Sequence, residues 1–173
     1  GRSARCMAWQ AFDPHSAQAL ILVLPRRQPP DREALEAWLA QARRAARLAH
    51  PNLAPAVDIG EQERWPFVAY DSALGPTLAE RSLPREGDAA ADIARWMAQA
   101  LAGLAFAHDA GLAHRDVQPF LLTLADNGSL RVLGLEVAAA DAGPQAPPTD
   151  VGDVNRHLRQ SRNAAERDVL ALA

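Results

Sequence analysis

The chain has 173 residues, a net charge of -3 and 49% hydrophobic residues, which is ordinary for one globular domain or two small lobes. The slightly acidic balance argues against a dedicated nucleic-acid binder, because such proteins usually carry a strongly basic face. The longest apolar run, at residues 19–24, is far too short to cross a bilayer. We therefore expect neither nucleic acid nor membrane as a partner, and a cytoplasmic location.

Two residue counts narrow the chemistry further. Cys6 is the only cysteine, so one chain can form neither a disulfide nor a cysteine-based zinc site. All 18 basic residues are arginine, and lysine is absent. A genome that avoids lysine codons would explain this absence, and it predicts an arginine wherever a lysine once stood.

The first half of the chain predicts strands and one long helix. Residues 9–24 predict two strands around a turn, because turn-forming residues precede a buried apolar run. Asp31 is placed to cap a helix that runs to about Ala49. A further short strand is expected at residues 65–70, and the linker between two lobes directly after it.

The second half predicts another long helix and then a hairpin. Asp88 is placed to cap a helix that ends at Gly111. Residues 121–124 and 130–133 are mostly apolar, and they flank Asp-Asn-Gly at residues 126–128. This tripeptide is a strong signal for a tight turn between two strands.

The chain changes character after the hairpin. Residues 138–153 are rich in Ala, Pro, Gly and Asp and lack periodicity, which predicts a mobile loop. A last helix is expected to begin near Asn163 or Asp168. No internal repeat or heptad pattern is visible.

The segment at residues 114–121, His-Arg-Asp-Val-Gln-Pro-Phe-Leu, resembles the catalytic loop of protein kinases, H-R-D-L-K-P-x-N. The expected hairpin follows where that family has the hairpin before its D-F-G motif. Residues 47–53 are similar to the segment after helix C of bacterial serine/threonine kinases, residues 75–78 to the stretch after the hinge, and residues 168–172 to the start of helix F. Because the order and spacing agree, the chain is identified as a member of the protein kinase superfamily.

The resemblance implies an α+β, protein-kinase-like two-lobed fold, with a small β-rich N-lobe that holds one helix and a mainly helical C-lobe. It also implies that this fold is truncated at both ends. The expected division is residues 1–73 for the N-lobe and hinge, and residues 74–173 for a partial C-lobe through the start of helix F. We therefore expect a longer parent chain, with a neighbouring domain or another protein as the partner.

The resemblance also assigns the positions that hold ATP. Kinases position the phosphates with a lysine and magnesium. That lysine aligns with Leu22, and the helix C glutamate that pairs with it aligns with Gln41. Removing one partner of a buried ion pair costs roughly 3–5 kcal/mol, whereas replacing both can be nearly neutral. A joint loss is therefore indicated, and codon bias does not explain it, since it would have left arginine.

The catalytic loop keeps one chemical group and lacks the others. Asp116 aligns with the residue that accepts the substrate hydroxyl's proton, and it is either a surviving base or a structural residue that hydrogen-bonds the loop backbone. The family's loop lysine is Gln118, its magnesium-binding asparagine is Leu121 and its D-F-G aspartate is Gly134. No metal ligand is therefore expected, and Glu136 is not expected to serve as a substitute.

The predicted nucleotide cleft departs from the family pattern in the glycine-rich loop that covers it, but not at the hinge. The family's three loop glycines align with Gly1, Ser3 and Cys6. A side chain at the second position would hinder close approach of the backbone to phosphate. The hinge needs only backbone groups, so adenine could still bind beside Asp71 and Ala73, with Tyr70 as gatekeeper. We expect no cofactor, with weak, metal-independent ATP binding left open.

Together these replacements predict a catalytically inactive protein-kinase-like domain, a pseudokinase that is not an enzyme and acts as a signalling scaffold or regulatory protein-interaction module. The alternative is a weak or atypical serine/threonine protein kinase that retains Asp116 as base. Arg43, Arg44 and Arg47 form a basic cluster on the first helix. This cluster is either a site for an acidic partner or a solvated helix face.

Overall fold

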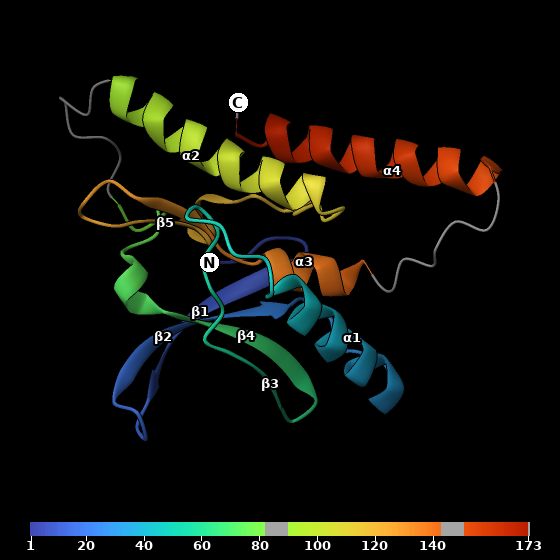
Figure 1. The fold of residues 1–173 in the computed structure, drawn as a ribbon. Coiled ribbons are helices and arrows are strands. Elements are labelled where there is room, and N and C mark those ends of the chain that lie inside the picture. Colours follow the sequence, from blue (N-terminus) through green and yellow to red (C-terminus); the bar gives the residue numbers. More distant parts are fainter. Residues whose placement is uncertain (82–89, 143–150, 173) are drawn as a thin grey trace.

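In a computed structural model of the protein, three segments are described: residues 1–81, 90–142 and 151–172, without the side chains of residues 151–159 and 161. An antiparallel sheet forms one side of the molecule and two long helices form the other (Figure 1). A short hairpin and a short helix lie between these layers, and a further helix lies beside the sheet. The arrangement is an α+β, kinase-like fold with a small β-rich part and a mainly helical part.

The sheet has four strands in the order β1-β2-β4-β3, and every neighbouring pair is antiparallel. The strands are β1 Cys6–Asp13, β2 Gln18–Pro25, β3 Asp58–Gln62 and β4 Trp65–Asp71. The two strands expected at residues 9–24 and the strand expected at 65–70 are therefore present. The sequence did not predict β3, because Asp-Ile-Gly-Glu-Gln lacks the apolar alternation that marks a half-buried strand.

Helix α1, Arg32–Ala45, packs its apolar side against the sheet. The expected cap is confirmed, since the Asp31 carboxylate accepts a hydrogen bond from the Ala34 backbone N–H at 2.8 Å. The helix ends at Ala45 and not near Ala49. Its last bonds tighten to a turn, with Arg47 N–H donating to the Arg44 carbonyl at 3.2 Å. The chain then runs along the later hairpin, where the Ala54 N–H donates to the Val132 carbonyl at 2.9 Å.

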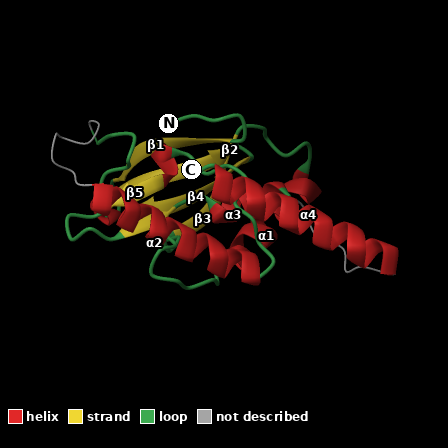
Figure 2. Ribbon diagram, turned by 90° about the horizontal axis from the view of Figure 1, so that it is seen from above, coloured by secondary structure: helices red, strands yellow, loops and turns green. Residues whose placement is uncertain are grey.

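The second half contains two long helices and a hairpin. Helix α2, Ala90–Asp109, crosses above the hairpin formed by β5, Leu122–Leu124, and β6, Leu130–Val132. The expected hairpin is confirmed. Figure 2, seen from the side of the long helices, shows α2 and α4 in front of the sheet. The expected helix cap at Asp88 lies outside the described residues.

Helix α3, Leu135–Asp141, replaces the first part of the expected loop at residues 138–153. Five of its seven residues are buried, because it fills the space between α1 and the sheet. Helix α4, Val151–Leu170, begins well before the expected start near Asn163 or Asp168. The rest of the expected loop, residues 143–150, lies outside the described residues.

Two apolar cores stabilise the molecule, one on each side of the hairpin. The first joins the sheet, α1 and α3 and includes Val23, Leu35 and Tyr70, while the second lies under α2 and includes Leu104 and Leu122. Short 3-10 helices at Ser72–Leu74 and Pro119–Leu121 connect the layers. None of the described helices is long and apolar enough to span a membrane.

Candidate functional site

The loop that carries Asp116 is held in a strained shape by a distant carboxylate. Arg115 has a φ of 63°, in the left-handed region that costs about 1–3 kcal/mol for a residue other than glycine. The Asp168 carboxylate accepts hydrogen bonds from the backbone N–H groups of His114 at 2.6 Å and Arg115 at 2.5 Å. His108 Nε2 lies 2.9 Å from the same carboxylate. These charge-assisted bonds offset the strain and fix the loop.

The Asp116 carboxylate is contacted by three side chains. The Ser3 hydroxyl donates to Asp116 Oδ2 at 2.5 Å, and the Cys6 thiol donates to the same oxygen at 3.2 Å. Gln118 Nε2 lies 3.4 Å from Oδ1. Burial raises the pKa of the Cys6 thiol to about 12, so it remains a protonated donor at neutral pH. Two residues expected in the glycine-rich loop therefore lie directly on the retained carboxylate.

No bond to Asp116 from the backbone of its own loop occurs among the described residues. Its partners are all side chains, one of them a seryl hydroxyl. A general base must stand within hydrogen-bond reach of the hydroxyl whose proton it takes. The Asp116 carboxylate can therefore accept a hydrogen bond from a hydroxyl, and in this structure the Ser3 hydroxyl is that donor.

A buried polar cluster joins β4 to the start of α3. The Tyr70 hydroxyl donates to Glu136 Oε2 and accepts a hydrogen bond from the Gly134 backbone N–H at 2.9 Å. All three residues are buried. Burial raises the pKa of Glu136, and burial beside Glu136 raises that of Tyr70 well above its ordinary value. The gatekeeper thus ties the sheet to the start of α3.

The two positions that hold magnesium in the family are apolar or committed elsewhere. Leu121 is fully buried in the first core, and Gly134 has a φ of 87° at the start of α3. Glu136 points at Tyr70. Within residues 1–81, 90–142 and 151–172, no three or more His, Cys, Asp or Glu side chains gather where they could hold a metal ion. These residues do not fit the family's magnesium ion.

The structure places Leu22 differently from the expected lysine position. Leu22 lies in register with Trp9 and Ala69, on the opposite face of the sheet from the buried Ile21 and Val23. Side chains alternate along a strand, so an alignment that is off by one residue exchanges the two faces. The β2 residues that face the core are Ile21 and Val23, so this face of the strand, like Leu22, offers only aliphatic side chains.

Gln41 lies at the edge of the buried face of α1. It is half-buried, and its side-chain oxygen accepts a hydrogen bond from Arg44 on the same helix. The helix positions that face the sheet and α3 belong to apolar residues such as Leu35 and Ala42. The glutamate position of the family therefore holds a neutral group that is satisfied locally.

The hinge residues form the N-terminal cap of the short 3-10 helix Ser72–Leu74. Asp71 ends β4, and its carboxylate accepts a hydrogen bond from the Ala73 backbone N–H at 2.8 Å. This bond uses the donor that adenine would need at Ala73. Tyr70, one residue earlier, is fully buried and faces away from the hinge toward Glu136.

Two features of the site were missed from the sequence. The sequence marks Asp168 only as the start of a helix, whereas in the structure its carboxylate fixes the loop of Asp116 by binding the Arg115 N–H, 53 residues away. A buried aspartate is rare unless it is paired, but the polar sequence around Asp168 gives no sign that this side chain is buried. The sequence predicts a loop from residue 138 onward, where the second half of α3 lies, because this Ala-rich segment lacks a clear helical stripe.

Comparison with known proteins places this geometry among the kinases. The chain is 31% identical to the serine/threonine-protein kinase PknL of Mycobacterium tuberculosis over 131 residues, which is 76% of this chain and 33% of PknL. It is 25% identical to the probable serine/threonine-protein kinase PknB of Lactococcus lactis over 183 aligned positions, covering 99% of this chain and 29% of PknB. The chain thus spans about a third or less of these relatives. No protein-family model matches it.

A solved structure supports the same fold. The crystal structure of Rad53 1-466 in complex with AMP-PNP matches 98% of this chain and 43% of that chain, with a TM-score of 0.63 and 12% sequence identity. Our prediction that the chain is not an enzyme is contradicted, since its relatives are named as serine/threonine-protein kinases, and it is corrected on that ground. The expected resemblance and fold are confirmed: the chain is a kinase-like domain that belongs to the protein kinase superfamily.

Proposed function

We propose that this chain is an atypical serine/threonine protein kinase domain of low activity, in which Asp116 accepts the proton of the substrate hydroxyl. The observation that supports this role is the hydrogen bond of 2.5 Å from the Ser3 hydroxyl to Asp116 Oδ2. In the reaction, the substrate oxygen forms a bond to the terminal phosphorus of a nucleoside triphosphate. The bond to the leaving diphosphate breaks, and the hydroxyl proton passes to the carboxylate.

The rate should be low because the groups that position the phosphates are replaced. Most of the acceleration in phosphoryl transfer comes from positioning and charge neutralisation. The chain contains no lysine, and Leu121 and Gly134 stand where the family has metal ligands. A substrate hydroxyl must also displace Ser3 from the carboxylate. Asp116 therefore acts with little help from its neighbours.

Transfer of radiolabelled phosphate tests this proposal. The protein is incubated with γ-labelled ATP and a serine-rich generic substrate, with and without magnesium, and compared with Asp116→Asn. Asp126→Asn is the matched control, because Asp126 is an exposed carboxylate in the hairpin turn. We expect slow labelling in the unmodified protein and the control and none in Asp116→Asn. Equal labelling in all three proteins would contradict the role of Asp116.

A second candidate function is a regulatory module that acts through protein contacts in signalling. It is favoured by the way the polar groups of the cleft are satisfied internally. Asp116 is covered by Ser3 and Cys6, and the Ala73 donor is bound to Asp71. Thermal unfolding with and without ATP separates the candidates, since a rise in Tm with ATP supports the kinase and an unchanged Tm supports the module.

A further inference from the structure

A groove with both apolar and charged lining residues lies at the C-terminal end of α1. It consists of two adjoining cavities, of about 430 and 340 Å³, that share Ala46 and Ala56. The first is lined mostly by the turn after α1 and by residues 50–56, and the second by the start of β3. We call these two cavities together the α1-end groove. The groove lies apart from the cleft that holds Asp116, because none of its lining residues contacts that carboxylate.

Exposed apolar side chains lie in and beside the α1-end groove. Val57, which lines it, is 53% exposed, and Phe106 is 38% exposed. Phe106 stacks on His50 of the groove wall, with 5.1 Å between the ring centroids. Single exposed apolar residues are common, but apolar residues gathered around one concave site indicate a binding surface.

The charge of the groove is opposite to that of the chain. Arg43 and Arg131 line it, and the exposed Arg47 stands between the lining residues Ala46 and Leu48. Asp58 is the one acidic residue in either lining, and its carboxylate accepts a hydrogen bond from the Ile59 backbone N–H at 2.8 Å. The groove is therefore locally positive in a protein of net charge -3.

Hydrogen bonds attach the segment that lines the first cavity to the hairpin. Ala54 N–H donates to the Val132 carbonyl at 2.9 Å, and Val132 N–H donates to the Asn52 carbonyl at 2.9 Å. The Asn52 side chain also donates to the Leu130 carbonyl at 2.9 Å. A preformed site loses less conformational entropy on binding than one that must first become ordered. These bonds therefore favour binding to the α1-end groove without a prior ordering step.

We propose that the α1-end groove binds an acidic peptide segment of a protein partner. Apolar side chains of the segment enter the two cavities, while its carboxylates pair with the guanidinium groups of Arg43, Arg47 and Arg131. Arginine suits this role because its planar donors match a carboxylate in pairs. The proposal rests on the protein-contact function proposed above and not on phosphoryl transfer.

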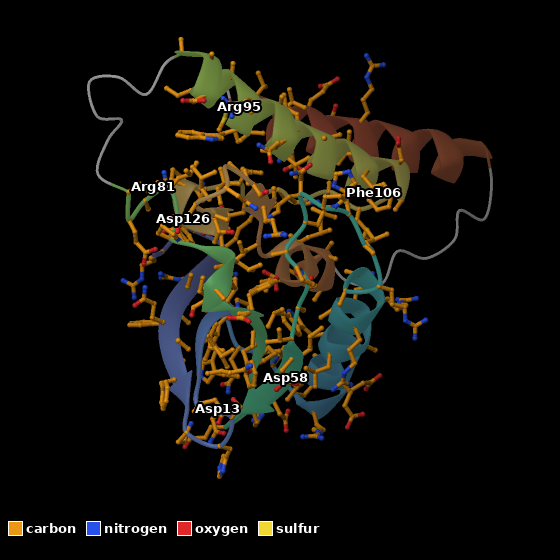
Figure 3. The ribbon with its side chains drawn as sticks, turned by 60° about the vertical axis from the view of Figure 1, so that its left-hand side comes forward. Asp13, Asp58, Arg81, Arg95, Phe106 and Asp126 are labelled. Atoms are coloured by element: carbon orange, nitrogen blue, oxygen red, sulfur yellow. The ribbon has the colours of Figure 1, made fainter. Side chains whose placement is uncertain are left out.

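Fluorescence anisotropy with a short labelled peptide, in which glutamates flank two leucines, tests the proposal at low salt without ATP. The test variant is Arg43→Glu/Arg131→Glu. The matched control is Arg95→Glu/Arg162→Glu, which changes the net charge equally on exposed faces of α2 and α4. Figure 3 shows Arg95 and Phe106 at opposite ends of α2. We expect binding to weaken at least tenfold in the test variant and less than twofold in the control.

Two further arms do not depend on the folding of the double variant. Val57→Asn, at an exposed position, should weaken binding several-fold because it removes an apolar contact. On the unmodified protein, a peptide with lysine in place of every glutamate should not bind. Equal weakening in test and control variants, or no effect of Val57→Asn, would overturn the proposal.

A single-stranded oligonucleotide of equal charge provides the last comparison. If the oligonucleotide binds the unmodified protein as tightly as the peptide does, and if Arg43→Glu/Arg131→Glu abolishes that binding too, the groove is a general polyanion site. The proposal then fails. Phosphate transfer by the Arg43→Glu/Arg131→Glu variant is measured in parallel. If the unmodified protein transfers phosphate but does not bind the peptide, only the groove proposal is overturned. If it binds the peptide and no protein transfers phosphate, only the kinase proposal is overturned.

Discussion

Replacing Tyr70 with phenylalanine perturbs the structure at one hydroxyl. That hydroxyl donates to Glu136 and accepts from the Gly134 backbone N–H, and all three residues are buried. Tyr70→Phe keeps the ring and its packing in the first core. The change therefore leaves one carboxyl group and one backbone donor without their partner in a place that water does not reach.

The expected cost follows from these two orphaned groups. A buried donor or acceptor that loses its partner costs about 1–3 kcal/mol. Two such groups give a destabilisation of about 2–6 kcal/mol for Tyr70→Phe. The total stability of a domain this size is typically about 5–15 kcal/mol, so this loss is large.

Urea unfolding at neutral pH, followed by tryptophan fluorescence, measures this loss. Glu136→Leu and the double variant Tyr70→Phe/Glu136→Leu complete a cycle, because the double variant removes the orphaned carboxyl group. We expect the two substitutions to be non-additive by about 1 kcal/mol or more. A cost below about 1 kcal/mol for Tyr70→Phe, or strict additivity in the cycle, would refute the role of this hydroxyl.

Three further predictions concern neighbouring groups. Burial raises the pKa of Glu136, so its protonated form stabilises the fold below the unfolded-state pKa and this contribution is lost as pH rises through the folded-state pKa. Within that window, urea unfolding should show a stability loss of up to about 1.4 kcal/mol per pH unit that Glu136→Gln abolishes; an identical slope in both proteins would contradict it. The Cys6 thiol, buried and with a pKa of about 12, should react with iodoacetamide far more slowly in the native protein than in urea, and equal rates would show that it is accessible. Gly134→Ala should destabilise the protein by about 1–2 kcal/mol in the same unfolding assay, because its φ of 87° disfavours a side chain even though a Cβ would meet only ordinary contacts; an unchanged midpoint would argue against this conformation.

Local signals predicted most of the small sheet and the hairpin. The turn residues before β2, the cap at Asp31 and the Asp-Asn-Gly turn act over a few residues, so they could be recognised without tertiary contacts. The family resemblance then gave the order of the parts. Asp116 was singled out in the same way, and the structure adds its contacts with Ser3 and Cys6.

The features that were missed depend on contacts between distant segments. Whether Leu22 or Val23 faces the core depends on a register shift of one residue, which an alignment without lysine could not fix. Helix α3 is stabilised by packing against α1 and the sheet and has little helical pattern of its own. Asp168 gains its role only when α4 brings it to the loop of His114.

The retained carboxylate of Asp116 is the centre of the functional account. The most direct measurement is the rate of phosphate transfer from labelled ATP by the unmodified protein and by Asp116→Asn, with Asp126→Asn as control. We predict slow transfer that Asp116→Asn abolishes and Asp126→Asn leaves unchanged. Transfer that persists in Asp116→Asn, or its absence from all three proteins, would contradict it.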